Sequence, residues 1–281
     1  LYSVNKNIVL VLESNSSLDI IWEKENLPAI LDAWYGGQAQ GQAICDVLYG
    51  AVNPSGKLTS TWYNSVEELP SATDSKFKSN GMLEYDIDDW GYTYMYYGKG
   101  TGSNVARQAE KPMYPFGYGL SYTTFEYSGL NLSSSTLKAD ETLKVTATVK
   151  NTGTRKGAEV VQVYVNFPNS GVEHVREMNR KLVGFERIEL EPGESKQVTI
   201  PVKHEQLCYF DQESKTYKVE AGDVELHVAA SSADDRLSQV FTTAPATVKY
   251  TYENMPTTDI ANTFNTQQPS FNSQHSTPVI S

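Results

Sequence analysis

The sequence of 281 residues is poor in cysteine and histidine and contains no long apolar run. Cys45 and Cys208 lie far apart in different predicted domains, so they indicate neither a disulfide framework nor a metal site. We expect both to be small buried apolar residues. The four histidines show no ligand spacing, and the sequence predicts no metal ion and no cofactor. No apolar run reaches the roughly 18 residues of a membrane helix, so we expect no membrane partner.

Basic residues are also scarce. The chain has 23 Lys and Arg against 34 Asp and Glu, a net charge of −11. Clustered Lys and Arg bind phosphate, and no such cluster exists here, so the composition argues against nucleic acid as a partner. The first residues, LYSVNKNIVLVL, lack the basic region and the cleavage site of a signal peptide. Because the chain starts with Leu and runs at once into an apolar stretch, we expect a fragment whose start lies upstream.

Residues 1–125 have the pattern of an α/β unit. The run NIVLVLE (7–13) is continuously apolar, which is typical of a strand buried on both faces of a parallel sheet, and 29–34 has the same character. The stretch 38–50 places apolar residues three and four apart and ends at a glycine, which predicts an amphipathic helix. Residues 57–63 are expected to form an edge strand, and 98–111 a mobile surface loop.

Residues 126–245 have the alternating pattern of an antiparallel β-sandwich. Polar and apolar residues alternate in runs that are joined by turn-forming connectors such as NTGTRKG and EPGES. The expected strands are 143–151, 159–167, 182–190, 196–202, 216–221 and 224–231. Residues 246–281 are rich in Thr, Asn, Gln, Ser and Pro and are predicted to be a disordered tail or linker.

The segment PFGYGLSYTTF (115–125) lies between these two parts. It holds four aromatic rings and two glycines and no charge. The glycines permit close approach of neighbouring chain, and the rings can enter a crevice. We predict that it joins the two domains, either by packing alone or also as a platform for a ligand.

An ordered set of motifs resembles the C-terminal half of glycoside hydrolase family 3 β-glycosidases. The set comprises LDAWYGGQAQGQAICDVLYGAVNPSGKL, then PMYPFGYGLSYTTF, then GAEVVQVYV and KLVGFERIELEPGESKQVTIPV, and it covers roughly residues 7–243. The resemblance implies a partial α/β sandwich domain, a parallel-sheet fragment with helices, followed by an all-β fibronectin type III-like sandwich. Secreted or periplasmic location is implied as well, with a cytoplasmic one left open.

The resemblance also implies a retaining mechanism that this chain cannot complete. In that mechanism an Asp attacks the anomeric carbon and a Glu protonates the leaving oxygen. The family carries its Asp on an N-terminal barrel and its Glu upstream of the strand that 7–13 resembles, and nothing here matches either piece. Glu13, Asp19 and Glu23 follow a predicted strand but align with no catalytic position. No catalytic residue is therefore expected, and the glycoside substrate would be bound through the missing barrel.

The stretch DDWGYTYMYY (88–97), here called the aromatic knot, holds the candidate substrate-binding residues. Trp90, Tyr92 and Tyr94 present faces on which a pyranose can stack, or they simply pack, and Asp89 can bind sugar hydroxyls. Together Asp86, Asp88 and Asp89 form an acidic cluster that suits calcium or hydroxyls, or a solvated loop face. Tyr92 stands where related sequences often carry Arg, which removes a fixed positive fork.

Two functions remain open from the sequence. The first is the C-terminal part of an exo-acting β-glycosidase, with the knot variant and the PMYP lead-in favouring the β-xylosidase over the β-glucosidase type. The second is a non-catalytic carbohydrate-binding or adhesion module. The strand 7–13 favours the first, because a free-standing module has no use for an incomplete parallel sheet. The sequence does not indicate which oligomeric state the protein has.

Overall fold

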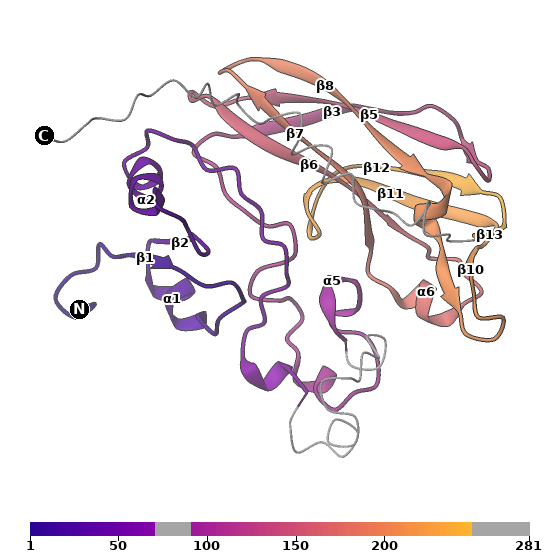
Figure 1. The fold of residues 1–281 in the computed structure, drawn as a ribbon, viewed down its shortest axis with the longest axis horizontal. Helices are drawn as coiled ribbons and strands as arrows, with labels where there is room; N and C mark the ends of the chain where they lie inside the picture. Colours follow the sequence, from indigo (N-terminus) through magenta and orange to yellow (C-terminus); the bar gives the residue numbers. More distant parts are fainter. Residues whose placement is uncertain (71–90, 249–281) are drawn as a thin grey trace, which may run out of the picture.

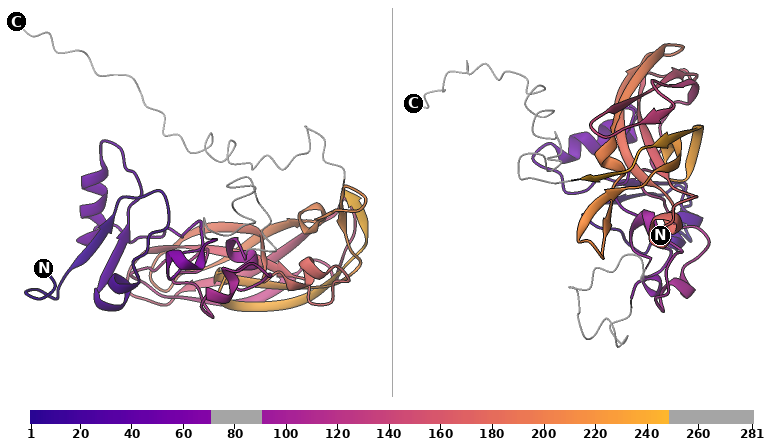
Figure 2. Two further views of the ribbon diagram at one scale, coloured as in Figure 1. Left: turned by 90° about the horizontal axis from the view of Figure 1, so that it is seen from below. Right: turned by 90° about the vertical axis from the view of Figure 1, so that its right-hand side faces the viewer.

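The computed structural model describes residues 1–70 and 91–248, which form an α/β unit followed by a β-sandwich (Figure 1). In Figure 2 the α/β unit sits at one end of an elongated sandwich, and the N-terminus lies at that same end. The predicted disordered tail falls, apart from its first three residues, outside the described residues. No helix in the described ranges is long and apolar enough to cross a bilayer.

The α/β unit contains a two-stranded parallel sheet. Strand β1 (Val9–Leu12) pairs with β2 (Ala29–Asp32), and α1 (Ile21–Asn26) connects them. Helix α2 (Gln40–Leu48) follows at the position that the apolar spacing predicts. The remaining short elements of this part are η1 (Val66–Glu68), α5 (Thr93–Tyr96) and η3 (Val105–Arg107).

The prediction that strand 7–13 is buried on both faces is wrong for the described chain. Val9 is 46% exposed, and only Leu12 of β1 is buried. The small core of this unit comprises Leu12, Ile20, Trp62 and Met113. Large apolar side chains elsewhere on the unit, such as Trp22 and Tyr49, are exposed, because no other element of the described chain covers them.

The sandwich has two main sheets whose inner faces form one core. Their strand orders are β4-β12-β11-β6-β7 and β3-β5-β8. The alternation in the sequence places every second side chain inside, as in β5, where Leu143, Val145, Ala147 and Val149 are at most 1% exposed. The strands of the two sheets are β3 (Phe125–Leu132), β4 (Thr136–Leu137), β5 (Thr142–Asn151), β6 (Gly157–Asn166), β7 (Lys181–Leu190), β8 (Ser195–Lys203), β11 (Gly222–Ser231) and β12 (Asp234–Thr243).

A third, smaller sheet closes one end of the sandwich. It has the order β13-β10-β9 and is built from β9 (Tyr209–Asp211), β10 (Thr216–Val219) and β13 (Ala246–Val248). Strand β13 extends ordered structure three residues past the expected end of the sandwich, because its backbone pairs with β10. Helix α6 (Glu173–Glu177) lies in the β6–β7 connection, and η4 (His204–Leu207) precedes β9.

The segment 98–111 is not the loosely attached loop that its composition suggests. Asn104 is 1% exposed and donates to the Glu68 carbonyl at 3.0 Å. Arg107 reaches the carbonyls of Glu67 and Leu69. Gln108 accepts from the Gly98 amide at 2.7 Å. The bonds of Asn104 and Arg107 tie the segment to η1 and its C-terminal flank, and the bond of Gln108 closes the segment on itself. The composition alone does not reveal these bonds.

The cysteines also differ from expectation. Cys45 is exposed on α2, and Cys208 is half-buried beside η4; the two thiols are not joined in a disulfide. Cys45 sits on a helix face that nothing in the described ranges covers, so its apolar character does not lead to burial here.

Candidate functional site

The segment 115–125, here called the clasp, forms backbone hydrogen bonds with residues 57–63, the predicted edge strand. Leu58 donates its amide to the Tyr118 carbonyl, and Gly117 donates to the Leu58 carbonyl, both at 2.8 Å. Trp62 and Tyr114 exchange backbone bonds in an isolated antiparallel bridge. The clasp therefore belongs by hydrogen bonding to the α/β unit, although it leads directly into β3.

The glycines of the clasp let backbone approach backbone and sandwich side chains. Gly117 has φ +79°, and a Cβ there would overlap Gln162 Oε1. Gln162 is buried and donates to the Gly117 carbonyl at 3.1 Å and to the Ala230 carbonyl at 2.8 Å. A Cβ on Gly119 would overlap the carbonyl oxygen of Gly56. Gly117 thus serves close packing between the two domains, and Gly119 serves close packing within the α/β unit.

The turn NPSGK (53–57) completes this junction. Asn53 Oδ1 accepts from Ser121 Oγ and from the Tyr122 amide, while its Nδ2 donates to the Lys156 carbonyl at 3.0 Å. Lys57 forms an ion pair of 3.0 Å with Glu159 of β6, in which the side chains are 13% and 8% exposed. The clasp and the turn 53–57, which both lie in stretches that resemble the glycosidases, therefore join the α/β unit to the sandwich.

Tyr94 of the aromatic knot packs into the same junction. Its ring stacks on Phe116 with centroids 4.2 Å apart and meets Tyr164 edge-on at 6.1 Å. Its hydroxyl accepts the Leu182 amide at 2.9 Å, and burial raises the pKa of the phenol against the lowering effect of that bond. The ring and the hydroxyl of Tyr94 thus already have protein neighbours, and a sugar contact by Tyr94 remains a prediction.

Of the other predicted substrate-binding residues, the structure describes only Tyr92. Tyr92 is half-buried and precedes α5 as its N-terminal capping position. Tyr92 interacts electrostatically with Tyr63. Burial raises the pKa of the Tyr63 phenol to about 12, and Tyr92 and Glu68 add to this rise. Trp90 and Asp89 lie outside the described residues, as do Asp86 and Asp88. The structure thus brings Tyr92 and Tyr94 to the start of one short helix.

Glu68 is a buried carboxylate that the sequence does not single out. It is 3% exposed and accepts bonds from the Tyr97 hydroxyl at 3.0 Å, from Asn64 Nδ2 at 3.0 Å and from the Ala109 amide at 3.1 Å. Burial and the neighbouring Glu68 charge raise the pKa of the Tyr97 phenol. Because its oxygens are taken by donors from three segments, Glu68 holds the knot region together.

The acids at the strand ends form no catalytic pair in the described structure. Glu13 and Asp19 are exposed and Glu23 is half-buried. Asp32, at the carboxyl end of β2, was not anticipated. Its Oδ1 is buried and has no hydrogen-bond partner among the described residues. Burial raises the pKa of this carboxyl, against a backbone bond from Trp34, whose φ is +53°. Carboxyl ends of parallel strands are where α/β sites form.

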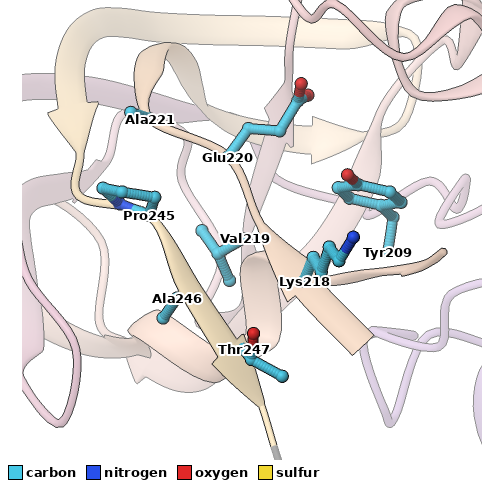
Figure 3. Close-up of a pocket in the computed structure, with 8 residues that line it drawn as sticks. All are labelled: Tyr209, Lys218, Val219, Glu220, Ala221, Pro245, Ala246 and Thr247. Carbon is cyan, nitrogen blue, oxygen red and sulfur yellow. The ribbon is translucent and has the colours of Figure 1, made fainter. Parts of the chain in front are cut away.

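Two cavities lie beside the small third sheet of the described structure. The larger, about 440 Å³, is shown in Figure 3, where Lys218 to Ala221 run between Tyr209 on one side and Pro245 to Thr247 on the other. Lys218 is paired with Asp211 at 2.6 Å, and Glu220 accepts a bond from Ser170. The second cavity has no Asp or Glu in its wall. Neither cavity offers the two carboxylates of a glycosidase, and the described ranges contain no group of three potential metal ligands.

Comparison with known proteins agrees with this two-part architecture. Residues 1–122 match the glycosyl hydrolase family 3 C-terminal domain, and 159–232 match the fibronectin type III-like domain. The β-glucosidase BoGH3A of Bacteroides ovatus is 35% identical over 243 residues, which are 86% of this chain and 31% of that protein. A β-xylosidase of Formosa agariphila is 36% identical over 242 residues, 85% of this chain and 30% of that one.

Solved structures show the same relation. A β-glucosidase of Kluyveromyces marxianus in complex with glucose superposes with a TM-score of 0.73 at 35% identity, over 89% of this chain and 28% of that one. β-Glucosidase 3B of Thermotoga neapolitana, in complex with α-D-glucose, gives 0.72 at 32% identity, over 89% and 33%. The chain spans about a third or less of these relatives. The chain therefore consists of a glycosyl hydrolase family 3 C-terminal domain, residues 1–122, followed by a fibronectin type III-like domain, residues 159–232.

Proposed function

We propose that this chain is the C-terminal region of a retaining, exo-acting β-glycosidase and that it contributes no catalytic carboxylate. The observation that carries the proposal is the two-stranded parallel sheet, whose apolar side chains are mostly covered only in part while the unit is firmly joined to a complete sandwich. Such a unit is suited to being completed by further chain, and the relatives are about three times as long as the region matched.

The reaction would divide between this chain and the rest of the enzyme. A nucleophilic Asp and an acid/base Glu must lie close together across the scissile bond, and both are assigned to sequence outside this chain. Trp90 and Tyr92 would form part of the substrate rim by stacking on a sugar, with Asp89 accepting from hydroxyl groups. Tyr94 would support them from behind, since its bond to Leu182 fixes the start of α5 to the sandwich.

The substrate would be a terminal β-glucoside or β-xyloside. The relatives include enzymes of both names, and the knot sequence favours the xyloside. A location outside the cytoplasm is supported by the similarity to the periplasmic β-glucosidase of Salmonella typhimurium, which is 36% identical over 233 residues.

Hydrolysis of chromogenic substrates tests the proposal. The chain 1–281 and the product of a reading frame that includes the sequence upstream of Leu1 are each mixed with p-nitrophenyl β-xyloside and β-glucoside. We expect nitrophenolate from the longer product only, with the anomeric configuration retained when followed by NMR. Turnover by chain 1–281 that disappears when one of its own carboxylates, such as Asp32, is changed to the amide would refute the proposal.

A non-catalytic carbohydrate-binding module is the second candidate. It is favoured by the 440 Å³ hollow, where the Tyr209 ring lies beside Lys218 and where Glu220 and Thr247 add polar groups to the lining. Affinity electrophoresis in gels containing soluble xylan or β-glucan separates the two candidates. Retardation that is lost in Tyr209→Ala, together with an inactive longer product, would favour the module.

A further inference from the structure

The second cavity has a volume of about 330 Å³ and lies between α5, α6 and the η4–β9 segment. Helices α5 and α6 both lie below the sandwich in Figure 1. Its wall is mainly apolar and includes two thioethers and several rings. The apolar part of the wall includes Met95, Tyr96, Phe167, Met178, Leu207 and Phe210. A cavity of this size and lining is within the range that binds small organic molecules.

One cationic side chain enters this apolar wall from an inward-facing strand position. Lys181 begins β7 and pairs in register with Val165, which is fully buried in the sandwich core. Directly opposed residues of an antiparallel pair project to the same face, so Lys181 faces the core side as well. Burial lowers the pKa of its ammonium group.

The ammonium of Lys181 is short of partners. An ammonium has three donors, and Nζ donates one hydrogen bond within the described residues, to the Cys208 carbonyl at 3.1 Å. Within residues 1–70 and 91–248 it has no carboxylate partner, and none lines the cavity. Lys181 is half-buried, and a charge removed in part from water without a counter-ion is costly, so an anion at this position would stabilise it.

Protection of the sheet edge does not account for all of these features. Strand β7 is the edge of its sheet, and an inward-pointing Lys is a known way to prevent pairing between edges. Edge protection, however, requires no cavity. Here the ammonium borders a hollow that His174 also lines, which brings a second group able to donate to an anion.

We propose that this cavity is a binding site for a small molecule with an apolar, preferably aromatic, body and one carboxylate, which pairs with Lys181. The charge complements the unpaired ammonium, and the flexible thioethers of Met95 and Met178 adapt to a planar ring. Although Met95 and Tyr96 belong to the knot, its described candidate sugar-binding residues do not line this site, and the site does not depend on the proposed glycosidase function. Tyr209 stands between it and the 440 Å³ hollow, since it lines both.

The test uses 3-phenylpropanoate as the probe and the full chain 1–281 with its five methionines labelled on the methyl carbon. We expect saturable shifts of the Met95 and Met178 methyl signals and none at Met113, which is buried in the α/β unit. The uncharged 3-phenylpropanamide should bind at least about tenfold more weakly, because it cannot form the ion pair.

Two lysine variants complete the design. Lys181→Met keeps the apolar stem without the charge and should lower the affinity for 3-phenylpropanoate at least about tenfold. An unchanged Met113 signal shows that this variant is folded. Lys218→Met, on the other side of Tyr209, should bind the probe as the parent does. The proposal is overturned if no saturable shift occurs up to about 10 mM probe, or if the amide or the Lys181→Met variant binds equally well.

Discussion

At Gly117 the backbone has φ +79°, and Gln162 and Tyr164 occupy the space that a side chain would need. A side chain at this position would therefore destabilise the fold in two separate ways. One is the left-handed conformation itself, and the other is the overlap with buried polar atoms that already bond to each other. Gly193, in the β7–β8 turn, has the same φ of +79°, but no atom lies within 4 Å of the place that an alanine methyl would take, so it isolates the first cost.

Gly117→Ala should lower the free energy of unfolding by about 3–5 kcal/mol, the sum of left-handed strain and overpacking. Gly193→Ala should cost only about 1–2 kcal/mol, since strain alone applies there. Urea unfolding of both variants followed by fluorescence measures the difference. Equal losses in the two variants would mean that the clasp does not press against Gln162.

Asp235 links two strands and the start of β7 through charge. Its carboxylate contacts His227 Nδ1 at 3.1 Å and is bonded by both terminal nitrogens of Arg180. Burial disfavours the charged form, but the interactions with His227 and Arg180 outweigh it and lower the pKa of Asp235 to about 2. A carboxyl whose pKa is lowered by folding stabilises the fold above its unfolded pKa, near 3.8, and loses that contribution as the pH falls toward 2.

Asp235→Asn should therefore lower the free energy of unfolding at pH 7 by about 1 kcal/mol, a modest value because a side chain 40% exposed is screened by water. The difference from the parent should shrink between pH 4 and pH 2, the interval set by the two pKa values. Urea titrations across this range measure it. Asp223→Asn, at an exposed position on β11, is the control and should show no such trend. A constant difference at all pH values would contradict the assignment.

At the scale of elements, the buried ion pair between the turn 53–57 and β6 is the main electrostatic link across the domain junction. Removing one member leaves the other charge buried without its partner. Lys57→Met and Glu159→Gln should each destabilise the chain, the former by about 3–5 kcal/mol. The double variant should cost less than the sum by about 1–3 kcal/mol. Strict additivity in urea unfolding would show that the pair is not coupled.

The strands in which polar and apolar residues alternate strongly were predictable from the sequence. Strands β5, β6, β7, β8, β10 and β11 all lie at expected positions because their inward residues recur every second position. Strand β4 has two residues and β9 three, too short for a period, and β12 presents mostly polar side chains. Strand β4 depends on pairing with β12, which is distant in sequence, and β9 depends on pairing with β10, which follows it after a short turn.

The candidate site was less predictable, for a related physical reason. The role of the glycines in the clasp could be anticipated, because their freedom is local. The bonds of Glu68 join residues 64, 97 and 109, and no spacing in the sequence links them. Lys181 looks like an ordinary surface lysine until the register of β7 with β6 turns it toward the core.

At the scale of the whole molecule, the two parts differ in how well they bury their apolar residues. The sandwich has a large continuous core, whereas four buried residues form the centre of the α/β unit. The α/β unit also leaves rings such as Tyr35 and Tyr49 70% and 88% exposed. A core this small cannot offset the conformational entropy of its chain, so the unit depends on the clasp and the sandwich.

Separate unfolding of the two parts tests this dependence most directly. Residues 121–248, 1–120 and the whole chain are each titrated with urea and followed by circular dichroism. The sandwich piece should unfold in one cooperative transition close to that of the whole chain, and residues 1–120 alone should show no transition. A cooperative transition of residues 1–120 by themselves would contradict an α/β unit that is held in place by its sandwich.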